Sequence, residues 1–265
     1  MNKMTVGLVA FGLAAAALAA PVESQWKGRK VAFLGDSITD HSTSATNYWG
    51  YLELDLGIKP LVYGINGHEM SQIRGQAEKL KKEHGDDVDA IFVFAGANDY
   101  FAEIPLGHWY DHTMEPSLWR RSKEPAPRRH PTVDGKTFRS RINVAISYIK
   151  ENFPDAQVIM LTPIHRGFAN FFVGDNMQSD ESFANPRGLH IEDYVNVVKE
   201  AGGVWSVPVI DMYSECGLMP SMDVHAKLFR DSKNDRLHPN LEGHWRMAEV
   251  IKYRILGMPA TFRRK

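Results

Sequence analysis

The chain has 265 residues, of which 43% are hydrophobic and 24% charged, a composition that is typical of globular proteins and excludes intrinsic disorder. Its formal net charge of -1 lacks the basic excess of a nucleic-acid-binding surface, so nucleic acid is not an expected partner. Cys216 is the only cysteine, which excludes an intramolecular disulfide, a paired-cysteine zinc site and a dithiol redox pair.

Residues 1–19 have the pattern of a signal peptide. Lys3 supplies a positive charge, an apolar stretch follows, and the small residues Ala17 and Ala19 precede the expected cleavage point. The alternative is a membrane anchor, but the apolar stretch is shorter than the roughly 20 residues that span a bilayer. We therefore expect an exported protein, periplasmic or secreted, without stable membrane insertion.

The rest of the chain, residues 20–265, alternates short apolar runs with segments of helical period. This alternation predicts parallel strands joined by crossover helices. Five runs are almost continuously apolar, as expected of strands that are covered on both faces: 30–34, 60–63, 90–94, 158–161 and 207–210. The sequence thus predicts a single three-layer α/β domain with a five-stranded parallel sheet.

Helical stripes lie between and after these runs. The best defined has apolar residues at i, i+4, i+7, i+8 and i+11, namely Phe138, Ile142, Ala145, Ile146 and Ile149. A second stripe begins at Tyr194, and Asn240 is a suitable N-cap for a last helix. Residues 100–136 contain five prolines and no sustained period, which predicts a long loop inserted after the third strand.

Ligands of open parallel sheets bind beyond the carboxyl ends of the strands. Residues 35–40 (Gly-Asp-Ser-Ile-Thr-Asp) follow the first predicted strand, residues 64–67 (Gly-Ile-Asn-Gly) the second, and residues 96–99 (Gly-Ala-Asn-Asp) the third. Near the C-terminus stand residues 235–239 (Asp-Arg-Leu-His-Pro). The candidate functional residues are therefore expected in these four segments.

These segments contain the groups that acyl transfer needs. A serine hydroxyl such as that of Ser37 is a weak nucleophile until an imidazole removes its proton, and a carboxylate must orient that imidazole. Asp235 and His238 are three residues apart, so one turn of chain could direct both toward Ser37. The N–H groups of Ser37 and Gly67 and the amide of Asn98 are candidate oxyanion donors.

The four segments together, in this order, resemble the four blocks of the SGNH (GDSL) hydrolase superfamily. The resemblance extends from about residue 30 to residue 256 and implies a flavodoxin-like sheet and serine-dependent ester hydrolysis. It implies Ser37 as nucleophile, Asp235 and His238 as the rest of the triad, and Gly67 and Asn98 as oxyanion donors. Gly64 is the alternative donor of the second oxyanion N–H, but we prefer Gly67 for this role. Ile38 replaces the usual leucine, a minor departure.

Two aspartates next to the motifs, Asp36 and Asp99, are expected to brace their turns by bonding local N–H groups. His108 and His112 have the spacing of a metal pair, but they lie among prolines and no third ligand is evident. We therefore expect no metal and no other cofactor.

The acyl group and the alcohol must be inferred from other residues. We expect residues 100–136 to lie near the active site, with Trp109 and Trp119 in contact with the substrate. His165, just after the fourth strand, is either a third contact or part of a solvated loop. Aromatic and arginine side chains suit a polar polyol, which predicts a small-molecule or polysaccharide substrate with O-acetyl groups. The alternatives are a lysophospholipase or thioesterase, and a catalytically silent carbohydrate-binding protein.

Overall fold

The computed structural model describes residues 24–117, 124–171 and 177–262. The expected signal peptide, residues 1–19, lies outside the described residues. No helix among the described residues is long and apolar enough to cross a bilayer. The main elements in chain order are β1 (Lys30–Gly35), α1 (Tyr48–Leu56), β2 (Lys59–Val62), α2 (Met70–His84), β3 (Ala90–Phe94), α3 (Ala97–Phe101), β4 (Tyr110–Pro116), β5 (Pro125–Pro131), α4 (Phe138–Asn152), β6 (Gln157–Leu161), β7 (Ala169–Asn170), β8 (Met177–Gln178), α5 (Ile191–Trp205), β9 (Val209–Ile210), α6 (Met212–Glu215), β10 (Phe229–Asp231), β11 (Asp235–Pro239) and α7 (Leu241–Leu256).

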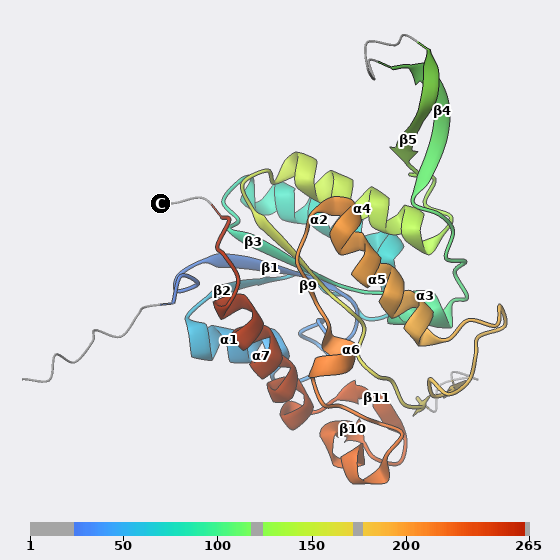
Figure 1. Ribbon diagram of the computed structural model, residues 1–265. Helices are drawn as coiled ribbons and strands as arrows, with labels where there is room; N and C mark the ends of the chain where they lie inside the picture. Colours follow the sequence, from blue (N-terminus) through green and yellow to red (C-terminus); the bar gives the residue numbers. More distant parts are fainter. Residues whose placement is uncertain (1–23, 118–123, 172–176, 263–265) are drawn as a thin grey trace, which may run out of the picture.

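A five-stranded parallel sheet forms the centre of the protein, in the order β2-β1-β3-β6-β9 (Figure 1). These are the five predicted strands, and their order is that of flavodoxin-like folds. Successive side chains of a strand point to opposite faces. Accordingly, Ala32 and Leu34 of β1 pack with α2, α4 and α5, whereas Val31 and Phe33 pack with α1 and α7. The predicted three-layer α/β fold is confirmed.

The helices begin where the sequence provides a cap. At the start of α4, the Thr137 side chain accepts a hydrogen bond from the N–H of Ser140, and the five residues of the predicted stripe are all buried. Asn240 caps α7 by accepting from the N–H groups of Glu242 and Gly243, as predicted. These two helices cover opposite faces of the sheet.

The expectation of a loop without regular structure over residues 100–136 is wrong. Strands β4 and β5 form an antiparallel hairpin, in register from Tyr110↔Pro131 to Pro116↔Pro125. The prolines of β5 stand at 125, 127 and 131, an even number of residues apart, so they share one edge. In a two-stranded sheet neither strand has a neighbour on its outer edge. A proline at a position whose N–H would point outward therefore removes no hydrogen bond between the two strands.

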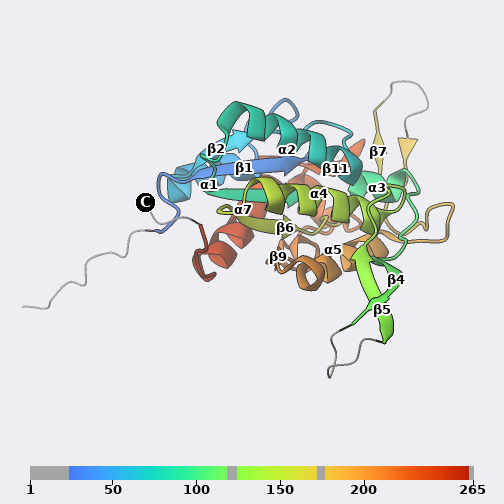
Figure 2. The same ribbon diagram turned by 90° about the horizontal axis from the view of Figure 1, so that it is seen from above.

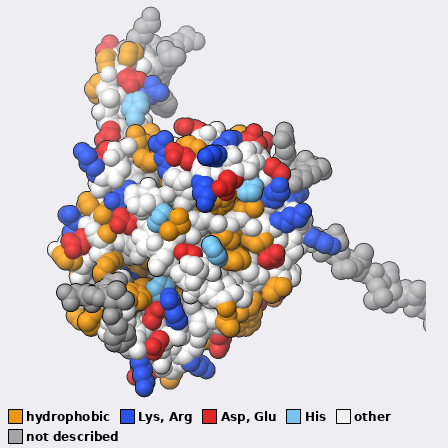
Figure 3. All heavy atoms as spheres, turned by 180° about the vertical axis from the view of Figure 1, so that it is seen from behind, with side chains coloured by type: hydrophobic (Ala, Val, Ile, Leu, Met, Phe, Trp, Pro, Cys, Tyr) orange, Lys and Arg blue, Asp and Glu red, His pale blue; other side chains and the backbone are white. Residues whose placement is uncertain are grey.

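This hairpin projects from the body of the protein, away from β11 in both ribbon views (Figures 1 and 2). At its base, the carbonyl of Trp109 accepts hydrogen bonds from the N–H of Thr132 and from the side chain of Asn143 on α4. On the face shown in Figure 3, acidic and basic side chains are interspersed, in keeping with a net charge near zero.

A second, smaller sheet, in the order β10-β11-β7-β8, carries the C-terminal motif. Asp235 of β11 pairs with Asp231 of β10 and with Ala169 of β7. The connection after β6 supplies β7 and β8, so this sheet lies toward the carboxyl end of the central strands. It therefore brings residues 235–239 to the edge where Ser37 follows β1.

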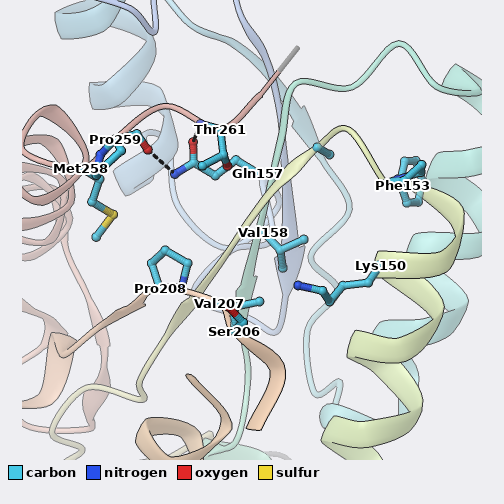
Figure 4. A pocket seen from close by; sticks show the side chains of 12 residues that line it. Lys150, Phe153, Gln157, Val158, Ser206, Val207, Pro208, Met258, Pro259 and Thr261 are labelled. Carbon is cyan, nitrogen blue, oxygen red and sulfur yellow. Dashed lines mark hydrogen bonds between the residues drawn. The ribbon is translucent and has the colours of Figure 1, made fainter. Parts of the chain in front are cut away.

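The opposite, amino edge of the sheet holds the two ends of the described chain. Trp26 is fully buried, and its indole N–H donates to the carbonyl of Ile255 at the end of α7. Gln157, at the start of β6, donates to the carbonyl of Pro259 and accepts from the N–H of Thr261 (Figure 4). A cavity of about 390 Å³ lies beside Gln157, Pro259 and Thr261, well separated in the fold from Ser37.

Candidate active site

Ser37, His238 and Asp235 form a chain of hydrogen bonds. The Oγ of Ser37 lies 2.9 Å from Nε2 of His238, and Nδ1 of His238 lies 3.0 Å from Oδ2 of Asp235. All three residues are buried, although 201 positions separate Ser37 from His238 in the sequence. A carboxylate beside Nδ1 favours the proton on that nitrogen, which leaves Nε2 free to accept the serine proton. The arrangement is that of an activated nucleophile.

The backbone of residues 235–238 turns around the Asp235 carboxylate. This turn explains how the side chains of Asp235 and His238, three positions apart, lie on the same side of the chain. Oδ1 accepts from the N–H groups of Leu237 and His238, at 3.1 and 3.0 Å. Burial opposes the charge, but the hydrogen bond and charge of His238 outweigh it, with help from Arg230, so the pKa of Asp235 lies below its usual range. The carboxylate is therefore ionised when the imidazole needs orienting.

Ser37 lies on a tight turn directly after β1. The carbonyl of Asp36 accepts from the N–H groups of Thr39 and Asp40, and its carboxylate accepts from the N–H of Ile38. Asp36 thus braces its own turn, as expected. Gly35 is required by close packing, because a Cβ there would stand 2.5 Å from the Thr39 hydroxyl and 2.6 Å from the carbonyl of Phe94.

The segment after β2 lies against this turn. Gly67 has φ +78°, in the left-handed region that glycine adopts most easily, and it lines the same cavity as Ser37. Gly64 instead packs against Thr39, where a Cβ would clash at 2.5 Å. Asn98 also lines the cavity, and its side-chain amide donates to the carbonyl of His68 at 2.9 Å. The three predicted oxyanion donors therefore lie around one cavity.

Two further side chains join these segments, and the sequence analysis did not identify either of them. Asp40 accepts from the N–H of Asn66 at 2.9 Å. Gln76 of α2, which is buried, accepts from the N–H of Gly35 at 2.9 Å, donates to its carbonyl at 2.8 Å, and lies 3.0 Å from Nδ1 of His68. Both fix the segment of Gly67 relative to the serine turn.

Asp99 connects helices rather than bracing its own turn. Its carboxylate accepts from the N–H of Met70, at the start of α2, and from Arg141 of α4, both at 2.8 Å. Burial raises the pKa of Asp99 to about 6, against the opposing effects of the Met70 N–H and Arg141. The carboxylate therefore positions two helices, which differs from the local role expected of it.

The cavity beside Ser37 has a volume of about 490 Å³. Within the described part of the chain most of the residues that line it have polar side chains, and Phe171 and Leu237 are the apolar ones. Besides the triad serine and histidine, the described lining consists of Thr43, Asn66, Gly67, Asn98, Phe171, Gln178, Arg230 and Leu237.

The predicted substrate contacts do not line this cavity where the structure describes them. The Trp109 indole donates to Glu200 at 2.8 Å and lies under Arg139, packed on the helices α4 and α5. The His165 ring lies on Tyr213, and its Nδ1 is 2.6 Å from Glu181. Trp119 lies outside the described residues. The described strands of the insertion form a projecting hairpin (Figure 1), and none of its described residues lines this cavity, contrary to the expectation that the insertion lies near the active site.

Comparison with known proteins gives a family and a fold. No curated protein matches the sequence. Solved structures with the same fold include a protein from Lactobacillus plantarum (23% identity, 86% of this chain and 97% of that one, TM-score 0.66). A possible lipase from Chitinophaga pinensis is 20% identical over 87% of this chain and 99% of its own, with a TM-score of 0.62. An acetylxylan esterase from Geobacillus stearothermophilus is 20% identical over 90% and 98%, with a TM-score of 0.52.

The family model describes enzymes that hydrolyse acyl esters, which agrees with the resemblance seen in the four sequence blocks. It matches residues 33–246, a stretch that begins within β1 and includes both Ser37 and His238. The match covers far more than half of the chain. This protein is therefore a carboxylic-ester hydrolase that belongs to the GDSL-like lipase/acylhydrolase family.

Proposed function

We propose that the protein hydrolyses O-acetyl esters of carbohydrates through an acyl-enzyme formed on Ser37. The observation that carries this proposal is the continuous hydrogen-bonded path from the Ser37 hydroxyl through His238 to Asp235. A buried serine that merely closed a turn would not need an imidazole held by a carboxylate at this distance.

The reaction follows from the positions of these groups. The Ser37 oxygen attacks the ester carbonyl while its proton moves to Nε2 of His238, and Asp235 stabilises the resulting imidazolium. The carbonyl oxygen becomes an oxyanion that the N–H groups of Ser37 and Gly67 and the Asn98 amide stabilise. Collapse breaks the bond to the alcohol oxygen, which takes the proton from His238.

The second half of the reaction releases the acid. Water enters beside the acyl-serine, gives its proton to His238 and adds to the carbonyl carbon. The second tetrahedral intermediate collapses, the Ser37 oxygen recovers its proton from the imidazole, and the acid leaves. No residue beyond the triad and the oxyanion donors is needed for these steps.

The scarcity of large apolar side chains around the cavity favours a short acyl group and a hydrophilic alcohol. A long acyl chain would find few apolar contacts in this cavity, because Phe171 and Leu237 are the apolar side chains of the described lining. Its binding would therefore gain little free energy from burial of apolar surface. One observation favours the alternative, a lysophospholipase or thioesterase. A more apolar cavity of about 440 Å³, lined by Tyr63, Ile65 and His68 among others, lies on the other side of the Gly67 segment.

We also propose that the protein is exported, periplasmic or secreted, and that its signal peptide ends at Ala19. The support is the sequence pattern of residues 1–19 described above. The N-terminal sequence of the protein recovered from the periplasm or medium of an expressing bacterium would test this. A mature chain that begins at Ala20 is expected, and retention of Met1 in the cytoplasm would contradict it.

The test of the activity is the rate of 4-nitrophenyl ester hydrolysis for acyl groups from acetyl to dodecanoyl, with purified Ser37→Ala as the blank. We expect kcat/KM to fall sharply beyond acetyl and the variant to lose turnover while it keeps its circular dichroism spectrum. Rates that rise with chain length would favour the lipid or thioester alternative. Release of acetate from acetylated polysaccharide is then the direct test, and glycan binding without acetate release would indicate the silent binding protein.

A further inference from the structure

Where the structure describes it, the wall of the cavity beside Ser37 carries a positive charge without a carboxylate. Among its described residues there is one permanent cation, Arg230, and no carboxylate. Amide groups from Asn66, Asn98 and Gln178 add further donors. A neutral polyol can both donate to and accept from these groups, whereas an anionic group gains the charge-assisted interaction with Arg230 in addition. The wall is therefore complementary to an anion.

Arg230 has the geometry of an anion-binding residue. Its Nε lies 3.1 Å from Oδ2 of Asp235, the oxygen that also faces Nδ1 of His238. Its side chain is 43% exposed, and among the described residues its ion pair is with Asp235, made through Nε and not through the two terminal nitrogens. A guanidinium has five donors in a planar fork that matches a carboxylate. The edge that faces the cavity is thus available to a ligand.

Gln178 presents its amide donors on the same wall, and a buried arginine fixes their orientation. The Oε1 of Gln178 accepts a hydrogen bond of 2.6 Å from Arg166, which is 2% exposed and lies over the rings of Tyr100 and Phe101. Since a guanidinium can only donate, the oxygen of Gln178 must face Arg166. The NH₂ group then has no partner among the described residues and points elsewhere, on a side chain that lines the cavity.

If the proposed function holds, the position of Arg230 indicates whether it faces the acyl part or the alcohol part of the ester substrate. His238 protonates the departing alcohol, so the alcohol lies on the His238 side of Ser37. Arg230 shares the Asp235 carboxylate with His238, and the Phe171 ring lies 5.8 Å from the imidazole ring. The oxyanion donors Gly67 and Asn98 come from other segments, after β2 and β3. The cation therefore faces the alcohol part and not the acyl group.

We propose that the substrate is an ester whose alcohol part carries a carboxylate, as a uronic acid unit does, and that Arg230 and Gln178 bind this carboxylate. Because Asp235 already engages Nε, the two terminal nitrogens of Arg230 remain for the ligand, and their planar edge matches the two oxygens of one carboxylate. Phe171 provides a flat apolar surface for the ring that carries the group. Arg230 is in this way a specificity-determining residue for the ester hydrolysis.

The experiment compares two small esters that differ in this charge. 3-Acetoxybenzoate and 3-acetoxybenzamide have the same acyl group and the same position of the ring substituent, and their rates of spontaneous hydrolysis provide the reference. We expect the wild-type protein to prefer the benzoate by about tenfold in kcat/KM, as a partly exposed charge-assisted pair allows. Arg230→Gln should reduce this preference to near one, Arg230→Lys should retain part of it, and added salt should weaken it.

Arg254→Gln is the matched control for the loss of one positive charge. Arg254 is half exposed, pairs with Glu215, and lies in the last turn of α7, about 20 Å along that helix from its first residue. The preference should survive this substitution. If Arg230 only supported Asp235, Arg230→Gln would slow both esters equally and leave the preference unchanged, which would overturn the proposal.

A wild-type preference near one would overturn the proposal as well. Hydrolysis of 4-nitrophenyl acetate that depends on Ser37 would show that the proposed esterase function still stands in that case. Absence of hydrolysis of all three esters would contradict the proposed function itself. The two failures are therefore distinguishable.

Discussion

Asp36 is a buried carboxyl group beside the nucleophile. Its side chain is almost fully enclosed, and burial raises its pKa to about 7, with Asp99 adding to the shift and the Ile38 N–H opposing it. The serine turn therefore contains an acid that gives up its proton only near neutral pH. Because an amide could make the same hydrogen bond to Ile38, the charge of Asp36 is not required for the turn.

Replacing this carboxyl by an amide should change how stability depends on pH. The folded-state pKa of about 7 exceeds the usual 3.8, so between these values the folded protein holds a proton that the unfolded chain has released. The stability due to neutral Asp36 is complete below pH 4 and is lost as the pH rises through 7. Asp36→Asn should therefore gain stability relative to wild type from pH 4 to pH 8, on the order of 3 kcal/mol.

Urea unfolding at several pH values measures this difference. Asp99 titrates in both proteins and largely cancels in the comparison. Asp86→Asn, at an exposed position, is the control and should show little pH dependence relative to wild type. A difference between Asp36→Asn and wild type that stays constant from pH 4 to pH 8 would contradict the raised pKa.

Gln76 shows where the sequence was informative and where it was not. The candidate triad and oxyanion donors stand in recognisable sequence blocks, so the sequence pointed to each of these residues before the fold was known. Gln76 lies inside the apolar stripe of α2, with Met70, Ile73 and Leu80. A polar residue in such a stripe signals a buried hydrogen-bond partner, but the sequence does not reveal that the partners are Gly35 and His68, which the tertiary fold brings to it.

Gln76→Met should lower both stability and turnover. It leaves the Gly35 N–H without its acceptor in a buried place, which costs about 1 to 3 kcal/mol in the free energy of unfolding. It also frees His68, whose carbonyl holds the Asn98 amide, so kcat should fall about tenfold or more with little change in KM. Steady-state kinetics with 4-nitrophenyl acetate would measure this, with Lys82→Met on the same helix as the control. A loss of stability without a fall in kcat would mean that Gln76 serves only the fold.

At the scale of elements, the five strands of the main sheet were predictable and the hairpin was not. Runs such as 90–94 are apolar throughout because both faces are covered, and this is a local property of the sequence. The prolines of β4 and β5 indicated a loop because they cannot donate to a ladder. The shared edge of the β5 prolines becomes visible only when the two strands are paired, and β7, β8 and β10 are too short to show a period.

Shortening the hairpin should leave the chemistry intact. Residues 111–130 can be replaced by an Asn-Gly turn, which keeps Trp109 and its bonds to Thr132 and Asn143. No described residue of the hairpin lines the cavity beside Ser37, so kcat/KM for 4-nitrophenyl acetate should stay within about twofold and the melting temperature within a few degrees. A tenfold loss on this small ester would show that the hairpin shapes the site. A loss confined to polymeric substrates would instead assign it to binding the polymer.

At the scale of the whole molecule, the two edges of the sheet have different tasks. The carboxyl edge carries the triad, the oxyanion donors and the buried carboxyl groups of Asp36 and Asp99. Burial raises the pKa of both carboxyl groups, so their ionisation destabilises the fold. The amino edge joins the two ends of the described chain through Trp26 and Gln157. Removal of residues 1–19 would leave residues 20–23 before this contact and would not disturb it.

Trp26→Ala tests this separation of tasks. The indole is fully buried, lies 5.1 Å from the Phe262 ring and 6.3 Å from the Phe92 ring between centroids, and donates to the Ile255 carbonyl. Truncation should therefore cost about 3 to 5 kcal/mol in the free energy of unfolding, measured by urea denaturation of the chain that begins at residue 20.

Trp245→Ala is the control for the loss of an indole, since Trp245 is 45% exposed and should cost less than about 1 kcal/mol. The kcat of the folded Trp26→Ala protein should match wild type, because the indole lies at the edge of the sheet opposite Ser37. A fall in kcat measured well below the unfolding transition would show that the amino edge influences the position of the triad, and that the two edges are coupled through the strands between them.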